Sequence, residues 1–158
     1  MARQFSLPAN LRITPLLAPA TTNGGADSRR INCKGLHKVW LVAEMKQAVG
    51  HATAVTLKQA TAVIGGSTAT GPSSQNWKNE DAAAADTLTK NANGTAITVT
   101  NDVKSKQLVF EVLPEDLTSG YPFVYLNFAD SSQATNFVSV TAYGLPSYQQ
   151  ASPPSAAA

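Results

Sequence analysis

The stretch VWLVAEMK, residues 39–46, decides the expected fold because its side chains fall into two alternating sets. One set is Val39, Leu41, Ala43 and Met45, and the other is Trp40, Val42, Glu44 and Lys46. A period of two residues is typical of a β-strand that buries one face. We therefore expect a strand within residues 31–48, with the first set facing a core.

A second strand is expected at residues 52–63, where Val55 and Leu57 face one way and Thr56 and Lys58 the other. Only the turn-prone tripeptide Val-Gly-His, residues 49–51, separates it from the first strand. Two alternating runs joined by a short turn predict a β-hairpin.

Four later segments alternate in the same way. They are residues 96–100, 107–113, 123–128 and 137–143. Their expected inward residues are Ile97 and Val99, then Leu108, Phe110 and Val112, then Phe123 and Tyr125, and finally Val138, Val140 and Ala142. The Asn-Gly pair within residues 91–94 predicts a further hairpin turn.

Helix is expected only as single turns at residues 82–85 and near residues 114–117, and the Gly- and Pro-rich residues 65–74 are expected to form a loop. Six or seven short strands at intervals of roughly ten residues predict an all-β fold, a single jelly-roll-like β-sandwich.

The two ends of the chain differ from this middle. Pro8, Pro15 and Pro19 exclude a helix and interrupt strand pairing, so we expect an extended N-terminal arm over residues 1–30. The sandwich is expected at 31–147, and the small, proline-broken residues 148–158 are expected to form a flexible C-terminal tail.

Composition favours assembly over other functions. Charged residues make up 14% of the 158 residues, against about 25% in an average protein. Uncharged polar groups cost less to desolvate at an interface than ions do. The 12 Lys and Arg form no run that would follow a phosphate backbone, so we expect no nucleic-acid partner. No apolar run approaches the roughly 18 residues of a membrane span, and no signal peptide is visible, so we expect no membrane partner and synthesis in a host cytoplasm.

Candidate chemistry is sparse. Cys33 is the single cysteine, so neither an intrachain disulfide nor a zinc site with paired thiolates is expected, and we expect no metal and no cofactor. His37 and His51 are the only histidines and lie in turn-like contexts. The Gly66–Gly71 segment has the glycine spacing of a phosphate-binding loop, but Pro72 stands where that motif requires lysine.

Acidic side chains could in principle supply a general acid and base, and they fall into two groups: Glu80, Asp81 and Asp86, and Glu111, Glu115 and Asp116. Spacing alone brings no two of them to a working separation. We interpret them as solvated turn carboxylates or a helix N-cap, and expect no catalytic residues and no enzymatic activity.

The strands also carry a resemblance. The segments KVWLVAEMKQAVGHATAVTLKQATAV (38–63), NWKNEDAAAADTLTK (76–90), KQLVFEVLPEDL (106–117) and ATNFVSVTAYGLPSYQQASPPS (134–155) resemble tailed-bacteriophage capsid decoration, or cement, proteins of HK97-type capsids. The resemblance implies a virion structural protein, located on the capsid exterior, that binds the assembled shell and bridges capsomers. Its expected partners are the major capsid protein and itself, as a homo-oligomer and in particular a trimer, because icosahedral shells offer threefold sites.

Candidate residues for contact with the capsid or with another subunit are Phe5, Leu7, Arg29, Arg30, Trp77, Tyr143, Tyr148 and Gln149. Trp77 has the alternative of closing one open end of the sandwich, and the arginines have the alternative of being simply solvated.

A competing hypothesis is a carbohydrate- or host-surface-binding β-sandwich displayed on the virion. Its candidate sugar platform is Trp40, Trp77, Tyr121, Phe123 and Tyr125. The alternation of Phe123 and Tyr125 is interpreted more simply as core packing.

Overall fold

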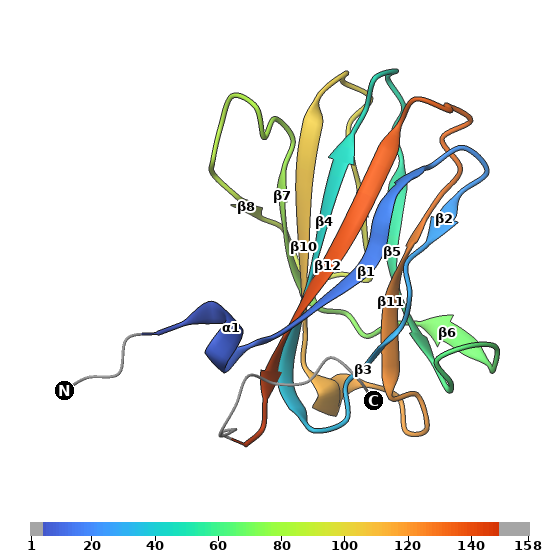
Figure 1. Ribbon diagram of the computed structural model, residues 1–158. Coiled ribbons are helices and arrows are strands. Elements are labelled where there is room, and N and C mark those ends of the chain that lie inside the picture. Colours follow the sequence, from blue (N-terminus) through green and yellow to red (C-terminus); the bar gives the residue numbers. More distant parts are fainter. Residues whose placement is uncertain (1–4, 149–158) are drawn as a thin grey trace.

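Strand β4 (Leu36–Lys46) lies inside a six-stranded antiparallel sheet, sheet A, whose order is β1-β12-β4-β10-β7-β8. The computed structural model describes residues 5–148 and is shown in Figure 1. The other strands of sheet A are β1 (Arg12–Thr21), β7 (Gln75–Asn79), β8 (Thr89–Lys90), β10 (Ser105–Val112) and β12 (Phe137–Pro146). Strand β12 is inserted between β1 and β4, so the sheet unites segments that are distant in sequence.

Sheet B packs against sheet A and has the order β2-β11-β5-β6. Its strands are β2 (Ala26–Asp27), β5 (Ala54–Ala60), β6 (Thr68–Thr70) and β11 (Phe123–Phe128). Two short strands lie off this path: β3 (Ile31–Asn32) pairs with β11, and β9 (Ala96–Thr98) pairs with β5. Helical structure in the described residues is limited to α1 (Leu7–Asn10) and a 3-10 turn at Pro114–Asp116. The predicted all-β fold, a single β-sandwich, is confirmed.

The core lies between the sheets and follows the predicted alternation. Strands β4, β10 and β12 bury every second residue. The buried set includes Val39, Leu41, Ala43, Met45, Val55, Leu57, Ile97, Val99, Leu108, Phe110, Val112, Val138, Val140 and Ala142. The inward residues of β11 are instead Val124, Leu126 and Phe128. The prediction that Phe123 and Tyr125 face the core is wrong by one residue of phase, because the aromatic residues of this strand occupy both of its faces.

Both predicted hairpins are wrong. Strand β4 pairs with β10 and β12, whereas β5 pairs with β11, β6 and β9, so residues 47–53 cross from one sheet to the other. The turn at 91–94 likewise connects β8 of sheet A to β9 of sheet B. Turn-forming residues indicate where the chain reverses, but both edges of β4 are already occupied by distant strands.

The expectation of an extended, helix-free N-terminal arm is wrong: residues 7–10 form helix α1 with Pro8 in its first turn, where proline is tolerated, and β1 and β2 occupy most of residues 11–30. Strand β1 is an edge strand of sheet A and runs antiparallel to β12, so the sandwich begins at Arg12. Pro15 and Pro19 are accommodated because the register shifts between Pro15 and Leu17 and again between Leu17 and Ala20. Prolines occur in sheets at such edges and bulges, where no ladder hydrogen bond is lost.

Two further segments differ from expectation. The expected loop at 65–74 contains β6, which pairs with the end of β5. Residues 75–79, for which no strand was expected, form β7 and pair with β10. Neither segment alternates between apolar and polar residues, so the period-two pattern does not reveal it. Within residues 5–148, no helix is both long enough and apolar enough to cross a membrane.

Candidate binding face on sheet A

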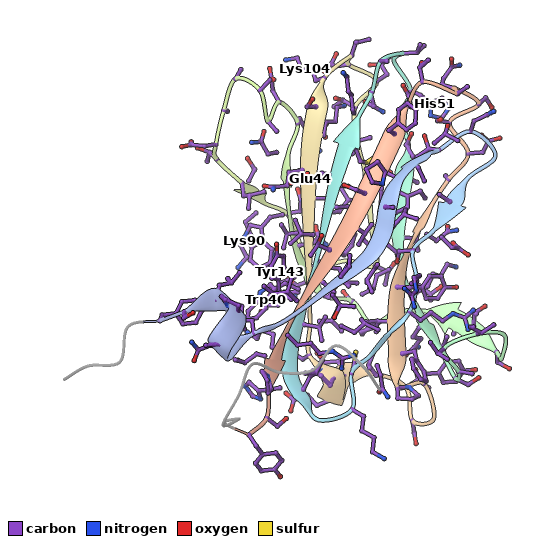
Figure 2. The ribbon with its side chains drawn as sticks, viewed as in Figure 1. Trp40, Glu44, His51, Lys90, Lys104 and Tyr143 are labelled. Carbon is purple, nitrogen blue, oxygen red and sulfur yellow. The ribbon has the colours of Figure 1, made fainter. Side chains whose placement is uncertain are left out.

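The outward side chains of sheet A line up in rows because its strands are in register. In one row Ile13, Tyr143, Trp40, Glu111 and Gln75 lie side by side on β1, β12, β4, β10 and β7. In the next row Pro15, Thr141, Val42, Val109 and Trp77 occupy the same five strands, and Lys90 follows on β8. Figure 2 shows Trp40, Tyr143 and Lys90 near one another over this sheet.

We use the name aromatic face for the apolar part of these rows: Ile13, Pro15, Trp40, Val42, Trp77, Val109, Thr141 and Tyr143. Ile13 and Pro15 are exposed, and the other six are half-buried. An antiparallel sheet in a monomeric protein commonly presents polar side chains on its solvent side. Here three aromatic rings and two valines share that side.

Trp40 is fixed in place by a carboxylate. Its indole Nε1 donates a hydrogen bond to Glu111 Oε2 at 2.9 Å. Lys38 Nζ donates to the other carboxylate oxygen, Oε1, at 3.0 Å and lies 5.7 Å from the centre of the Trp40 ring. A ring whose polar edge is already bonded presents its apolar surface without the entropy cost of being ordered on binding.

A shallow hollow of about 400 Å³ lies beside the aromatic face on the same side of sheet A. Its outward-facing lining includes Glu44, Lys46, Gln107, Phe137 and Ser139, and Pro19 and Ala82 border it. The hollow therefore combines one phenyl ring with several hydrogen-bonding groups.

The structure brings two of the predicted contact residues together. Tyr143 on β12 and Trp77 on β7 both lie on the aromatic face, with two strands, β4 and β10, between them. Because Trp77 points outward from the middle of β7, the alternative that it closes an end of the sandwich is wrong.

The other predicted contact residues lie elsewhere. Phe5 precedes α1 and is 70% exposed, and Leu7 in α1 is also exposed. Tyr148 follows β12 and is 81% exposed. Arg29 and Arg30 lie between β2 and β3. Gln149 lies outside the described residues.

The proposed sugar platform is not one surface. Trp40 and Trp77 share the aromatic face, but Phe123 and Tyr125 belong to sheet B. Tyr125 is buried, and the guanidinium carbon of Arg30 lies 5.2 Å from the centre of its ring. Tyr121 lies in the loop before β11. On the aromatic face, sequence reasoning missed Ile13, Pro15, Val42, Val109 and Thr141, although an apolar Val42 at an outward position of an alternating strand is a visible signal.

Two of the acidic residues weighed as a general acid and base, Glu80 and Asp81, form ion pairs with lysines. Glu80 forms ion pairs with Lys78 at 2.8 Å and with Lys106 at 3.0 Å. Burial raises the pKa of Glu80, but hydrogen bonds from both lysines outweigh this and hold it below its usual value. The Asp81 carboxylate pairs with Lys104 at 2.7 Å, and the hydrogen bond from that lysine lowers the pKa of Asp81.

The two histidines cannot act together, because His37 lies at the beginning of β4 and His51 lies beyond its other end. His51 Nδ1 is 3.2 Å from the hydroxyl of Thr53. In Figure 2, His51 and Lys104 lie toward one end of the sandwich, away from Trp40 and Tyr143. Within residues 5–148, no group of three or more His, Cys, Asp or Glu side chains is arranged to hold a metal ion. Burial raises the pKa of the Cys33 thiol to about 12.

The fold and the aromatic face define the chain as a β-sandwich with one apolar outer surface. No protein-family model matches it, and no curated protein matches it. Among solved structures, it is similar to the SPBc2 prophage-derived protein YomS, with 10% sequence identity, a TM-score of 0.48, and coverage of 86% of this chain and 93% of that one.

A second similar structure is a protein from Bacteroides thetaiotaomicron whose description proposes sugar binding. It has 12% identity and a TM-score of 0.34, and the match covers 84% of this chain and 81% of that one. One structural neighbour is thus a prophage-derived protein. At these identities and scores, the likenesses concern the sandwich fold and carry no argument about function.

Proposed function

We propose that this chain is a non-enzymatic virion structural protein that binds the outer surface of an assembled phage capsid through the aromatic face of sheet A. The observation that carries the proposal is the aromatic face itself. It is a contiguous apolar surface on the solvent side of a sheet, and surfaces of this kind mark interaction sites.

The composition of the face suits contact with a protein. Tryptophan and tyrosine are enriched at the centres of interfaces, and charged residues are depleted there. Trp40, Trp77 and Tyr143 provide the rings, while Gln75 on β7 and Lys90 on β8 stand at the ends of the two rows. This arrangement matches an apolar centre with a polar margin.

The exposed apolar residues before β1 provide a second contact. Phe5 and Leu7 are too exposed to stabilise the sandwich. They precede Ile13, which lies at one edge of the aromatic face. We infer that this segment extends the same contact surface onto the neighbouring molecule.

Binding of this kind stabilises a shell by mass action. A ligand that binds only the assembled state lowers the free energy of that state relative to dissociated capsomers. A protein that contacts two capsomers at once therefore opposes their separation. We infer a homo-oligomer, in particular a trimer, because a threefold site would present the same contact three times.

The experiment is co-sedimentation of the purified protein with expanded HK97-type capsid shells. The test variant combines Val42→Thr, Val109→Thr and Tyr143→Thr, which keeps β-branched residues in the strands while removing apolar surface. We expect its affinity for shells to fall about 100-fold, or about 2.7 kcal/mol.

The matched control carries Thr56→Ser and Thr98→Ser on the outer side of sheet B and should bind as the unmodified protein does. Circular dichroism checks that both variants are folded. Failure of the unmodified protein to sediment with shells, or equal binding by the test variant, contradicts the proposal. Sedimentation velocity gives the oligomeric state of the free protein. A protein that is monomeric in solution and also binds the shell as a monomer would exclude the trimer.

A second candidate function, binding of carbohydrate on a host surface, is favoured by the hollow beside the aromatic face. Sugar sites combine a ring with several hydrogen-bonding side chains, and Phe137 lies there with Glu44, Gln107 and Ser139. A glycan array distinguishes the two functions. Binding that is lost in Phe137→Ala but kept in the valine and tyrosine variant would favour the carbohydrate function, and an array without signal would exclude it.

A further inference from the structure

A second cleft, which shares only Pro15 with the aromatic face, lies between the two sheets. Its volume is about 400 Å³. One wall is the inward side of edge strand β1, and the other is formed by β3 and the residues before it. The lining residues are Arg12, Thr14, Pro15, Leu16, Arg29, Arg30, Ile31, Asn32, Val63 and Phe123. In Figure 1, the chain from β2 to β3 passes alongside β1 in this region.

The cleft concentrates positive charge. Three arginines line it, and among the described residues no aspartate or glutamate does. All four ion pairs between described residues are made by lysines, so neither Arg29 nor Arg30 pairs with a described carboxylate. Like charges held in one cleft raise its free energy, and a bound anion relieves that cost.

Arg30 is held rigidly. Its Nη1 donates hydrogen bonds to the carbonyl oxygens of Ala62, at 2.7 Å, and Gly65, and its guanidinium carbon lies 5.2 Å from the centre of the Tyr125 ring. Arg29 is anchored through its backbone, whose N–H donates to Leu16 O at 2.8 Å, while its side chain is exposed. One arginine is thus preorganised, and its neighbour is available to close over a ligand.

The wall formed by β1 also contains a buried polar atom, the hydroxyl oxygen of Thr14. The hydroxyl oxygen of Thr14 is buried and makes no hydrogen bond within the described chain. Thr14 lines the cleft. A buried hydroxyl without a partner is costly, so a ligand oxygen that accepts its hydrogen would add binding free energy.

The walls of the cleft indicate which kind of ligand would bear the anionic group. Pro15, Leu16, Ile31, Val63 and Phe123 give the cleft apolar surface beside its arginines. Strand β1 is an edge of sheet A, and β3 pairs on one side only, with β11. Strand edges offer backbone donors and acceptors to an extended segment, and alternate side chains of that segment would meet the apolar walls. A free phosphate ion would use none of these features.

We propose that this cleft binds an extended acidic peptide segment of a partner protein, whose carboxylate is held by Arg29 and Arg30 and by the Thr14 hydroxyl. None of the three residues that would hold the carboxylate belongs to the aromatic face, and the site can be tested without a capsid. Arginine and carboxylate groups match in geometry and form strong paired hydrogen bonds.

The test uses fluorescence anisotropy with a labelled peptide of alternating valine and glutamate and a control peptide in which glutamine replaces glutamate. Arg29→Gln should weaken binding of the acidic peptide about tenfold or more. The matched control Lys34→Gln removes the same charge from a nearby turn outside the cleft and should change affinity less than about twofold. The glutamine peptide should not bind.

Thr14→Val gives an independent readout. The substitution is close to isosteric and removes an unpartnered hydroxyl, so the free protein should melt at the same temperature or higher, while peptide affinity falls several-fold. A structural role alone would move both quantities downward.

Three results would overturn the proposal. One is an equal loss of peptide affinity in Arg29→Gln and Lys34→Gln, which would indicate that the peptide responds to the net charge of the protein and not to this cleft. Another is binding of the glutamine peptide as tightly as the acidic one. The last is displacement of the acidic peptide by inorganic phosphate at equal concentration, which would identify a site for a free oxyanion.

Discussion

The strands of sheets A and B alternate in the same way, but the outer faces of the two sheets differ in chemical character. On sheet B, Thr56 is paired with Asn127, and Lys58 with Tyr125, whose ring lies under Arg30. On sheet A, the corresponding central positions hold Trp40, Val42 and Val109. Both sheets contribute apolar inner side chains to one core, so the fold itself does not require the aromatic face. We therefore expect the outward side chains of sheet A to serve the proposed contact more than the folding of the sandwich.

The largest expected effect concerns the inner face of sheet A. Phe110→Ala should lower the free energy of unfolding by about 3–5 kcal/mol, because Phe110 is fully buried and the substitution leaves a cavity. Its outward neighbour supplies the contrast, since Val109→Thr should cost less than about 1 kcal/mol. Urea unfolding measures both. Similar losses would mean that the aromatic face is part of the folding core.

The second largest loss of stability is expected from removing a buried charge, that of Lys106, at the margin of the inner face. The Lys106 side chain is wholly buried, and its Nζ donates to Thr100 O at 2.6 Å and Thr100 Oγ1 at 2.8 Å as well as pairing with Glu80. Lys106→Met should lower the free energy of unfolding by about 2 kcal/mol. The loss is smaller than for a fully buried ion pair, because Glu80 still pairs with Lys78 and still contacts solvent. The control Lys104→Met removes an exposed pair and should change the unfolding midpoint little.

The same cluster makes stability depend on pH. The pKa of Glu80 is lowered in the folded state from 4.5, so its contribution is present above that value and is lost as the pH falls through the lowered folded pKa. Glu80→Gln should therefore flatten the loss of melting temperature between about pH 5 and pH 3. Glu44→Gln, on the outer side of sheet A, changes the same charge and serves as control. An unchanged acid slope in Glu80→Gln would contradict the assignment.

The smallest expected effect is at the junction of the sheets, where Cys33 follows β3 of sheet B and precedes β4 of sheet A. Burial raises its pKa to about 12, so the thiol remains protonated and covered at neutral pH. Iodoacetamide should label the folded protein negligibly and the urea-unfolded protein completely, as measured by mass spectrometry. Rapid labelling without urea would show that this junction opens independently of the two sheets.

Sequence reasoning succeeded where the signal is local. Leu108, Phe110 and Val112 alternate on one strand, and their burial follows from that strand alone. The prediction of strand pairing failed, because the partners of β4 are the distant strands β10 and β12. No turn residue identifies such a partner. Strand β1 was expected as an arm because proline excludes regular pairing, while the bulges that accommodate proline depend on β12.

The candidate sites were predictable only in part. Trp77 and Tyr143 were named from their residue types, and so were Arg29 and Arg30. That Trp77 lies beside Val109, and Tyr143 beside Trp40, depends on register between strands. The cleft between β1 and β3 depends on how the two sheets are placed, which leaves no periodic pattern in either segment. Thr14 was missed for that reason, since its hydroxyl is buried only by tertiary structure.

The insertion of β12 between β1 and β4 also determines when the protein can function. Tyr143 and Trp40 become neighbours only after the segment ending at Pro146 has been synthesised and has paired with strands made much earlier. Pairings between distant segments form slowly and leave apolar strands exposed in the meantime. During translation the aromatic face is therefore incomplete, and a nascent chain cannot make the proposed contact before β12 has paired with β1 and β4.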